Sequence, residues 1–333
     1  MSPRLDVNAG AAAYDVPAEH IRLLTKVARM YHERGMRQPQ IAAHLHISQP
    51  RVSRLLKQAV AAGIVRTVVI TPRGVHAELE EAVEQRYGLS EVVVADSGEG
   101  TEEAAVTPAI AAAAAVYLET TIAREDRVGI SSWSGSLLAT VDAMHPAPSL
   151  AAERVVQILG GVGTSAAQSL ATRLTGGLAR NLRAEAVYLV APGLVATPRM
   201  RDALVQEPSI GAVFKAWEDL TVALVGVGSL EPSTLLRESG NAIAAEEEQR
   251  LRALGAIGDV CMRFFDGNGQ HISSELDDRV LGIGSEMLRK VPRRVGVAGG
   301  ERKWTAIRAA LTGGWVNVLI TDQATAADLV RDR

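Results

Sequence analysis

The stretch that decides the fold of the N-terminal part is QPQIAAHLHISQPRVSRLLKQAV, residues 38–60. It reads as two short helices joined by a tight turn at His46, a residue that adopts the left-handed conformation less readily than glycine. Ala42 is small where the two helices cross, Ser48 stands at an expected N-cap, and Pro50 falls in the first turn of the second helix. This pattern predicts a helix-turn-helix whose second helix enters a DNA major groove.

The side chains of this stretch separate into an apolar and a polar set. The apolar set, which we expect to hold the two helices together, is Ile41, Leu45, Ile47, Val52, Leu55 and Leu56. The polar set carries groups that bond base edges and phosphates. The DNA-binding candidates are Gln40, Ser48, Gln49, Arg51, Ser53, Arg54 and Lys57. We expect Gln49, Arg51 and Arg54 to read bases. Phosphate contacts are expected from Arg22, Arg37, Arg51 and Lys57.

An ordinary helical hairpin is the alternative for this stretch, and local charge distinguishes the two. Residues 20–70 contain nine Lys and Arg residues and a single acid, Glu33, for a net charge of +8. Because the whole chain carries −3, the remainder carries −11. A basic region joined to an acidic one is typical of a nucleic-acid reader attached to another domain. Apolar residues at helical spacing predict one more helix within residues 21–35, with Tyr31 in its core.

Length and composition bound the class of protein. At 333 residues, with 47% hydrophobic and 22% charged residues, the chain suits a globular protein with one small and one large domain. The single cysteine, Cys261, excludes a disulfide framework and a cysteine-based metal site. The histidines show no metal-ligand spacing, so we expect no metal and no cofactor.

The N-terminus and the longest apolar run decide the expected location. Residues 1–19 lack the layout of a signal peptide, and we expect them to form a disordered lead. The apolar run 109–118 is shorter than the roughly 20 residues that span a bilayer. We therefore expect a cytoplasmic protein without membrane contact.

After residues 71–74 the pattern changes to alternating strands and helices. The expected strands are short, β-branched and almost continuously apolar, as in parallel sheets buried on both faces. They are residues 91–96, 127–130, 155–159, 186–190, 221–228, 262–265, 294–299 and 316–321. Helices are expected at 77–88, 165–182 and 306–314. The alternation predicts an α/β fold: a small all-α helix-turn-helix domain at residues 20–71, then a large doubly wound Rossmann-like domain at residues 75–333.

Several of the expected strands end in glycine and serine, namely at SSWSGS (131–136), GGVGTS (160–165), Ser229 after the strand 221–228, and AGG (298–300). Glycine lets the backbone approach a ligand closely, and amides at a helix start hold anions. Lys303, three residues after Gly300, adds a positive charge. Open parallel sheets bind ligands beyond the carboxyl ends of their strands, so these loops predict a small-anion site. Glycine-rich turns are also routine structural features of such folds.

The chain from about Ile21 onward resembles the SorC family of bacterial sugar-responsive transcription regulators. The stretches that carry the resemblance include SQPRVSRLLKQA (48–59), VVQILGGVG (155–163), GAIGDVCMRFFDGNGQ (255–270), VAGGERKWTAIRAAL (297–311) and VNVLITDQATAADLV (316–330). The resemblance implies an effector domain related to glucosamine-6-phosphate deaminase, ribose-5-phosphate isomerase and CoA-transferases. It also implies a repressor of a carbohydrate or polyol utilisation operon. A sugar phosphate or sugar alcohol would be the effector, and a homodimer or homotetramer would bind double-stranded operator DNA.

The resemblance further implies the effector contacts, which are Ser131, Ser134, Gly135, Ser136, Gly161, Asp259, Arg279, Gly300 and Lys303. Backbone amides, hydroxyls and Lys303 suit a phosphate, and Asp259 accepts hydrogen bonds from sugar hydroxyls. One departure concerns the first loop, where the family shows a run like Trp-Gly-Arg-Thr and this chain has Trp133-Ser134-Gly135-Ser136. The missing arginine favours a less charged effector, even an unphosphorylated sugar alcohol. We expect Trp133 to pack rather than to stack on a sugar.

Two other classes of function compete with this one. A sugar-phosphate isomerase- or deaminase-like enzyme fused to a DNA-binding region is the alternative that the superfamily suggests. An architectural DNA binder without a ligand is the third, but the acidic α/β part is far larger than DNA bending needs. The sequence shows no nucleophile elbow, no Cys/His pair and no paired carboxylates beside a histidine at the strand ends. We therefore expect no catalytic residue and no enzyme.

Overall fold

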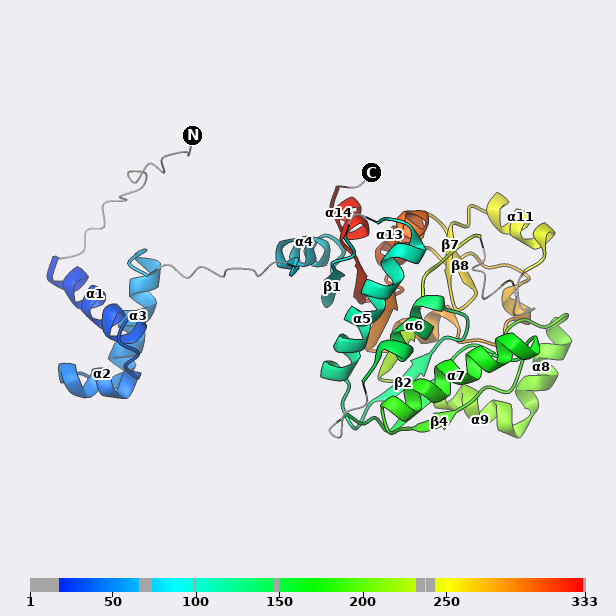
Figure 1. The fold of residues 1–333 in the computed structure, drawn as a ribbon, viewed down its shortest axis with the longest axis horizontal. Coiled ribbons are helices and arrows are strands. Elements are labelled where there is room, and N and C mark those ends of the chain that lie inside the picture. The colour runs from blue at the N-terminus through cyan, green and yellow to red at the C-terminus, as the bar shows by residue number, and fades with distance from the viewer. Residues whose placement is uncertain are drawn as a thin grey trace. The chain divides into compact units, whose positions relative to one another are not determined.

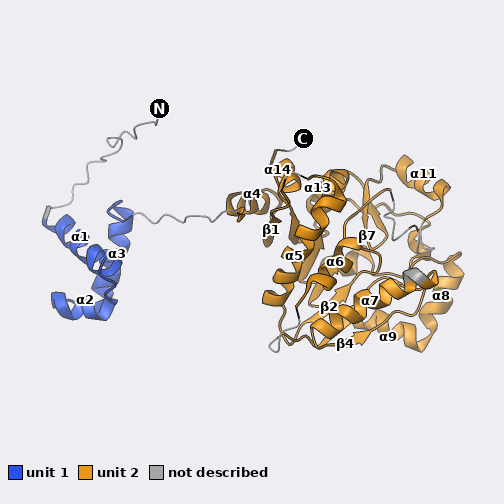
Figure 2. Ribbon diagram, viewed as in Figure 1, with its two compact units in different colours: residues 1–70 blue, residues 71–333 orange. Residues whose placement is uncertain are grey.

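The computed structural model describes residues 18–65, 74–98, 100–145, 150–231, 237 and 243–331. They belong to two compact units, Met1–Ile70 and Thr71–Arg333, which we call the N-terminal unit and the C-terminal unit (Figure 2). The lead expected at residues 1–19 lies outside the described residues up to residue 17, and helix α1 already begins at Ala18. The boundary expected at residues 71–74 also lies outside them, apart from Gly74.

The described part of the N-terminal unit contains the helices α1 (Ala18–His32), α2 (Gln38–Leu45) and α3 (Gln49–Ala61) (Figure 1). Helices α2 and α3 are the pair expected within residues 38–60. His46 turns the chain between them in the left-handed conformation, with a φ of 54°. The Ile47 amide then donates to the Ala42 carbonyl oxygen at 3.0 Å. Ser48 is the N-cap residue of α3, but its hydroxyl accepts no capping hydrogen bond.

The core of the N-terminal unit is built by all three helices together. Val27, Ile41 and Val52, one from each helix, are fully buried. Burying a side chain of this size contributes about 1.5–3 kcal/mol, and helices this short are marginal alone, so packing between them holds the unit together. Tyr31 was expected in this core and is 39% exposed instead. Its ring lies edge-on against that of His32, with 4.9 Å between the centroids, rather than against another helix.

A seven-stranded parallel sheet forms the centre of the C-terminal unit (Figure 1). In spatial order its strands are β1 (Glu91–Ala95), β10 (Val318–Asp322), β9 (Arg293–Val297), β5 (Val222–Val225), β2 (Arg127–Ile130), β3 (Arg154–Gln157) and β4 (Glu185–Val187). The chain runs outward from β2 through β3 to β4 and returns to β5 on the other side of β2. The position between β2 and β5 is therefore the topological switch point, where open α/β sheets bind ligands.

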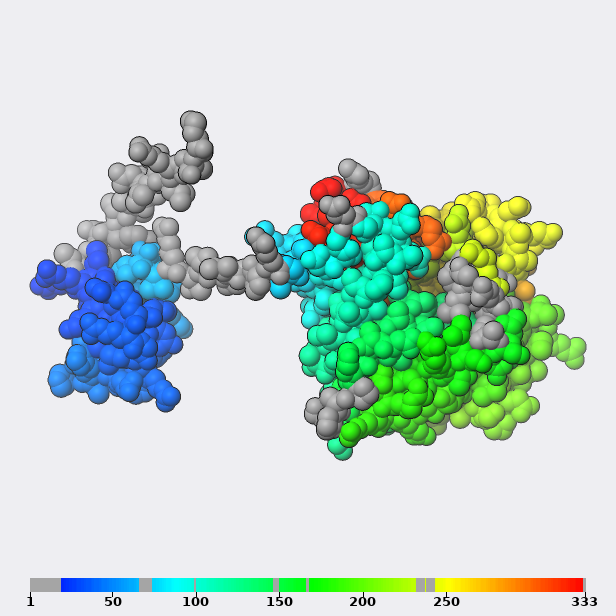
Figure 3. Space-filling model, viewed as in Figure 1, coloured from blue at the N-terminus to red at the C-terminus, as the bar shows by residue number. Residues whose placement is uncertain are grey.

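Helices cover both faces of this sheet, which confirms the doubly wound α/β prediction. One face packs against α5 (Glu103–Thr121), α6 (Gly135–Ala143) and α7 (Ser165–Asn181). The other packs against α9 (Pro208–Ala216), α13 (Trp304–Thr312) and α14 (Gln323–Arg331). Helices α5 (teal) and α7 (green) form much of the surface seen in Figure 3. The other helices among the described residues are α4 (Ala77–Tyr87), α8 (Pro198–Gln206), α11 (Ala245–Ala253), α12 (Ser285–Lys290) and the 3₁₀ turns η1 (Asp277–Arg279) and η2 (Glu301–Lys303).

Strand β5 shows why these strands are continuously apolar. Val222 and Leu224 face the α5 side of the sheet, whereas Ala223 and Val225 face the α13 side. All four residues are fully buried. A parallel strand with helices on both faces has no solvent side, so successive residues are all apolar.

Helix α4 protects one edge of the sheet. Strand β1 is an edge strand, and its Val92 and Val94 amides donate to the carboxylates of Glu84 (2.8 Å) and Glu80 (2.9 Å). Residues four apart on a helix are about 6 Å apart along its axis, close to the roughly 6.6 Å between alternate residues of a strand. Because open edge amides are templates for pairing with another chain, the two carboxylates block association at this edge.

A small antiparallel sheet follows β5 directly and consists of β6 (Gly228–Ser229), β7 (Gly258–Val260) and β8 (Arg263–Phe265). The stretch 262–265 was expected as another parallel strand, and that expectation was wrong. Only Cys261 and Met262 separate β7 from β8, which is too short a connection for a parallel crossover. These two residues have φ values of 54° and 60°, the left-handed conformation that a two-residue hairpin turn requires.

The apolar run 109–118 lies within the longer helix α5. Among the described residues, α5 is the one helix that is long and apolar enough to cross a membrane by length and composition, with 19 residues. Its residues Val106, Ile110 and Leu118 are buried in the cluster that covers one face of the sheet. In this structure α5 is a core helix of the C-terminal unit.

Candidate functional site

A cavity of about 660 Å³ opens at the switch point between β2 and β5. Its walls come from the loop after β2 (131–135), the loop after β5 (226–231), the β7–β8 hairpin, and the starts of α5 and η2. The loops after β2 and β9, both singled out from the sequence, therefore meet. Of the described residues, none in the loop 160–165 lines the cavity.

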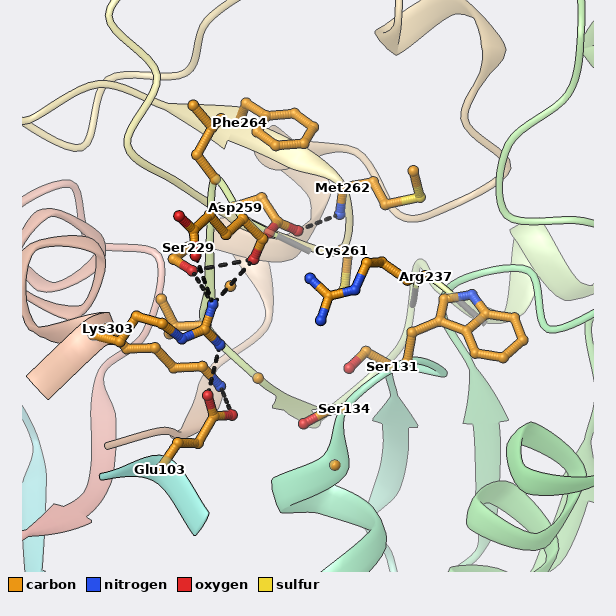
Figure 4. A pocket seen from close by; sticks show the side chains of 18 of the residues that line it. Glu103, Ser131, Ser134, Ser229, Arg237, Asp259, Cys261, Met262, Phe264 and Lys303 are labelled. Atoms are coloured by element: carbon orange, nitrogen blue, oxygen red, sulfur yellow. Dashed lines mark hydrogen bonds and ion pairs between the residues drawn. The ribbon is translucent and has the colours of Figure 1, made fainter. Parts of the chain in front are cut away.

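Charged side chains form a paired cluster in the cavity wall (Figure 4). Glu103, the first residue of α5, binds a different cation with each carboxylate oxygen. Lys303 Nζ lies 2.7 Å from Oε1, and Arg302 Nη2 lies 2.6 Å from Oε2. Burial raises the pKa of Glu103, but the charges of Lys303 and Arg302 outweigh burial and hold it below its ordinary value. Lys303, which the sequence assigned to a phosphate, is thus already ion-paired to a carboxylate.

Gly300 explains how Glu103 reaches this position. Its φ is +90°, and a Cβ there would lie 3.1 Å from the backbone N and Cα of Glu103. The Gly300 amide donates to Oδ2 of the fully buried Asp322 at 2.9 Å. Gly300 therefore lies behind the cavity wall, where it lets α5 begin close to the loop after β9.

Asp259, on the middle strand of the small sheet, brings a second carboxylate to the cavity. Its Oδ2 accepts the Met262 amide at 2.9 Å. On the neighbouring strand a Cβ at Gly228 would lie 2.1 Å from Asp259 Oδ1, so only glycine leaves room for this carboxylate. Burial raises the pKa of Asp259 to about 6, although the Met262 amide and the Lys303 charge lower it. At neutral pH the group is ionised and is a strong acceptor for hydroxyl groups.

The loop after β2 supplies hydroxyl groups and the start of a helix. Ser131 is 6% exposed and lines the cavity, and no described residue hydrogen-bonds its Oγ. Ser134 is the N-cap of α6, where its Oγ accepts the Leu137 amide at 3.2 Å. Gly135 also lines the cavity and is the first residue of that helix. The first amides of a helix lack internal partners and favour an anion or a hydroxyl oxygen.

Another part of the lining is apolar and includes Trp133, Leu159, Leu230, Met262 and Phe264. Trp133 is 7% exposed, and its Nε1 donates to the Gly160 carbonyl oxygen at 3.0 Å, which fixes the ring. Trp133 packs in a core cluster, as expected, and also lines the cavity. A lining that combines carboxylates, hydroxyls and an aromatic ring suits a small ligand with hydroxyl groups on a carbon skeleton.

The structure brings together five of the nine residues that the resemblance implied as effector contacts. Those that line the cavity are Ser131, Ser134, Gly135, Asp259 and Lys303. Those that do not are Ser136, Gly161, Arg279 and Gly300.

The residues outside the lining have other contacts that explain their positions. Ser136 is buried in α6, and its carbonyl oxygen accepts the Thr140 hydroxyl at 2.8 Å. At Gly161 a Cβ would lie 2.2 Å from Gln157 Nε2, so the glycine permits close packing. Arg279 is ion-paired with Glu247 of α11. These residues support the surroundings of the cavity rather than its surface.

Glu103, Arg302 and Arg237 also line the cavity and were not among the residues expected from the sequence, whereas Ser229, another lining residue, stands at one of the expected strand ends. A signal existed for Glu103, because it starts the helix that follows a predicted strand, at residues 91–96. For Arg302 the signal was its position directly beside Lys303. No pattern marked Arg237, which lies in the long connection between β6 and α11.

The predicted DNA-binding side chains lie on α2, on α3 and in the turn between them. Gln49, Arg51, Arg54 and Lys57 are exposed, and Ser53 is half-buried. Because Arg51, Arg54 and Lys57 follow one another at three-residue spacing, they share one side of α3. Ser48 is exposed at the N-cap. The remaining candidate, Gln40, has a structural contact, since its Oε1 accepts the Arg37 amide at 2.9 Å.

More positive charge lies on α1 and, at Arg34, just after its end. Arg22, Lys26, Arg29 and Arg34 line a groove that also includes His44 of α2. Arg29 is paired with Glu33 at 2.8 Å. The basic character of the N-terminal unit therefore extends beyond α3, and Arg22 was expected to contact phosphate.

Metal chemistry has no ready ligand set here. Within the described ranges, no group of three or more His, Cys, Asp or Glu side chains could hold a metal ion. Cys261 lines the cavity, but burial raises the pKa of its thiol far above the neutral range. A buried thiol of this kind is not a nucleophile at neutral pH.

Comparison with known proteins agrees with this geometry. A family model described as "Putative sugar-binding domain" matches residues 74–331. The sorbitol operon regulator of Klebsiella pneumoniae is 32% identical over 318 residues, which cover 94% of this chain and 99% of that protein. The deoxyribonucleoside regulator of Bacillus subtilis strain 168 is 33% identical over 314 residues, with 94% and 99% covered. The crystal structure of the full-length K. pneumoniae sorbitol operon regulator matches with a TM-score of 0.70 and 31% identity, over 94% of this chain and 100% of that one.

Proposed function

The chain belongs to the SorC family of sugar-binding transcriptional regulators, and we propose that it is a repressor whose binding to operator DNA is controlled by a small sugar-like effector. The effector, a sugar phosphate or a sugar alcohol, binds in the cavity at the switch point. The observation that carries the proposal is this cavity, in which Ser131, Asp259 and Lys303 meet from three separate elements. The operon controlled is one for carbohydrate or polyol use, in keeping with the names of the two relatives.

Helix α3 reads the operator in this proposal. Gln49, Arg51 and Arg54 reach base edges in the major groove, and Lys57 contacts phosphates together with Arg22 and Arg37. Each neutralised phosphate releases counterions, so the affinity falls as the salt concentration rises. Two N-terminal units of a homodimer or homotetramer occupy the two half-sites of a partly palindromic operator.

The effector acts by shifting an equilibrium between two arrangements of the oligomer. It binds one arrangement more tightly than the other, and the favoured arrangement fits the operator poorly. A ligand can shift such an equilibrium only by its differential affinity for the two states. Effector binding and operator binding therefore weaken each other by the same factor.

We assign no catalytic step to the C-terminal unit. The relatives are named as regulators, and the cavity is given the role of a binding site only. We place the protein in the cytoplasm, where operator DNA and the effector are both available.

A thermal-shift screen of the full chain tests the proposal. The probes are free tetritols, pentitols and hexitols, the parent sugars, and the terminal phosphates of each. A ligand that binds the folded state raises the melting temperature, by an amount set by its concentration relative to Kd. Lys303→Met should abolish the response of any hit, whereas Lys290→Met, at an exposed position outside the cavity, should keep it. A hit that responds equally in both variants would place the effector elsewhere and refute the proposed site.

A further inference from the structure

We infer that Glu103 makes the cavity selective for uncharged polyhydroxylated ligands, such as free sugar alcohols or sugars, over their phosphorylated forms. The inference rests on the proposed function, because it concerns the ligand of the same cavity. It assigns the selectivity to a carboxylate that starts α5 and reaches the cavity between two cations.

The charges of the described lining residues balance one another. The described lining contains three cations, Arg237, Arg302 and Lys303, and three acids, Glu103, Glu231 and Asp259. With all six ionised, these described lining residues have no net charge, so they offer no excess positive charge to offset an anion. A phosphate monoester brings about 1.5–2 negative charges at pH 7 and would leave the cavity strongly negative. Placing unpaired charge in a partly buried site is costly.

Glu103 also holds the cations that a phosphate would need. Its two oxygens lie 2.7 Å from Lys303 Nζ and 2.6 Å from Arg302 Nη2. The second guanidinium nitrogen of Arg302 donates to Ser229 Oγ at 3.1 Å and lies 3.7 Å from a Glu231 carboxylate oxygen. A phosphate must either displace Glu103 from both cations or bind next to its negative charge. Because the Glu103 side chain is 32% exposed, water screens this repulsion only in part.

An uncharged polyol meets no such penalty, because each hydroxyl both donates and accepts. Its hydroxyls can donate to the carboxylates of Glu103 and Asp259, and they can accept from Lys303 and the start of α6. Ser131 Oγ, which no described residue hydrogen-bonds, offers one more partner. The carbon skeleton can lie against the apolar lining, including the fixed ring of Trp133. All of these contacts leave the Glu103 ion pairs in place.

The first experiment uses wild-type full-length protein and isothermal titration calorimetry at pH 7.5. The probes are free tetritols, pentitols, hexitols and aldoses, each compared with its own terminal phosphate. The best free ligand should bind at least about tenfold more tightly than its phosphate, a difference of about 1.4 kcal/mol. A phosphate that binds more tightly than its parent overturns the inference and leaves the proposed function standing. If no member of either class binds, the proposed function itself fails.

The second experiment removes the charge of Glu103 without changing its size. Glu103→Gln should raise the affinity for the phosphate by about tenfold and lower the affinity for the free ligand. Inorganic phosphate should compete with the free ligand in this variant and not in the wild type. Glu102→Gln is the matched control, because it removes the same charge one residue earlier, at an exposed position outside the cavity. An unchanged preference in Glu103→Gln, or an equal gain for phosphate in Glu102→Gln, would overturn the role of Glu103.

Discussion

Replacing Asp259 by Asn should stabilise the C-terminal unit at neutral pH, even though Asp259 lines the ligand cavity. Burial raises the pKa of this carboxyl from 3.8 to about 6, against the lowering effects of the Met262 amide and Lys303. The folded state therefore binds the proton more tightly than the unfolded state. The contribution of this carboxyl group to the free energy of unfolding is therefore greatest below about pH 4, and this contribution is lost as the pH rises through about 6.

The size of this effect follows from the shift. A rise of about two pKa units corresponds to up to about 3 kcal/mol of destabilisation at pH 7.5, and to about half of that at pH 5. Asn has nearly the same shape, keeps an oxygen to accept the Met262 amide and carries no charge. Asp259→Asn should therefore increase the free energy of unfolding by this amount. It should also lose effector binding, because the buried charge binds the hydroxyl groups of the ligand and at the same time destabilises the fold.

Urea unfolding followed by tryptophan fluorescence measures this prediction selectively. All four tryptophans, Trp133, Trp217, Trp304 and Trp315, lie in the C-terminal unit, so the signal reports that unit alone. The gain in Asp259→Asn should be larger at pH 7.5 than at pH 5. Asp278→Asn, at an exposed position, is the control and should show no such dependence. A variant less stable than the wild type at pH 7.5, or an equal gain at both pH values, would refute the reasoning.

Further predictions concern the other parts of the molecule. Arg54→Ala should weaken operator binding by about 1–3 kcal/mol in fluorescence anisotropy at fixed salt and reduce discrimination against scrambled DNA; an equal loss on both DNAs would make Arg54 a phosphate contact. The double variant Glu80→Ala/Glu84→Ala leaves two edge amides of β1 without their charged acceptors. It should lower the free energy of unfolding, measured in urea, by about 1.5–3 kcal/mol for each lost hydrogen bond, and it should increase self-association measured by light scattering. An unchanged free energy of unfolding and unchanged self-association would argue against protection of this edge by α4. Gly228→Ala places a Cβ 2.1 Å from Asp259 Oδ1 and should abolish the ligand-induced rise in melting temperature, whereas Gly267→Ala, with open space around it, should keep it.

The helix-turn-helix and the parallel sheet could be predicted because local patterns decide them. The spacing of apolar residues in residues 38–60 places both helices, and His46 adopts the left-handed turn in spite of its Cβ. Strands buried on both faces, such as β5, appear as unbroken apolar runs. The hairpin of β7 and β8 was mistaken for a parallel strand, because periodicity does not report pairing direction. The two-residue connection at Cys261–Met262 carries that information, but it lacks the glycine or asparagine that usually marks such a turn.

The residues of the candidate site could be predicted from the sequence where they directly follow one predicted strand. The rule that ligands bind at the carboxyl ends of strands pointed to the loop that begins at Ser131 and to Lys303, whereas Asp259 was expected only from the resemblance to the SorC family. It could not show that Glu103, about 200 positions from Lys303 in sequence, would neutralise that lysine, because this contact depends on how α5 crosses the sheet. Gly161 and Gly300 were expected as contacts from the resemblance to the SorC family, and neither of them lines the cavity. The sequence does not show which atoms lie next to these glycines, namely Gln157 Nε2 beside Gly161 and the Glu103 backbone beside Gly300, and these close approaches explain why both positions are glycine.

The most direct test of the account is whether occupancy of the cavity changes operator affinity. Fluorescence anisotropy should be measured at one fixed salt concentration, on DNA that the protein itself selects from a random-sequence pool. The titration is run with and without the polyol or sugar phosphate that gives the largest thermal shift. The account predicts that this ligand weakens DNA binding at least about tenfold in the wild type, within the usual range of allosteric coupling, and leaves Lys303→Met unaffected. A ligand that stabilises the C-terminal unit and leaves operator affinity unchanged would contradict the central claim.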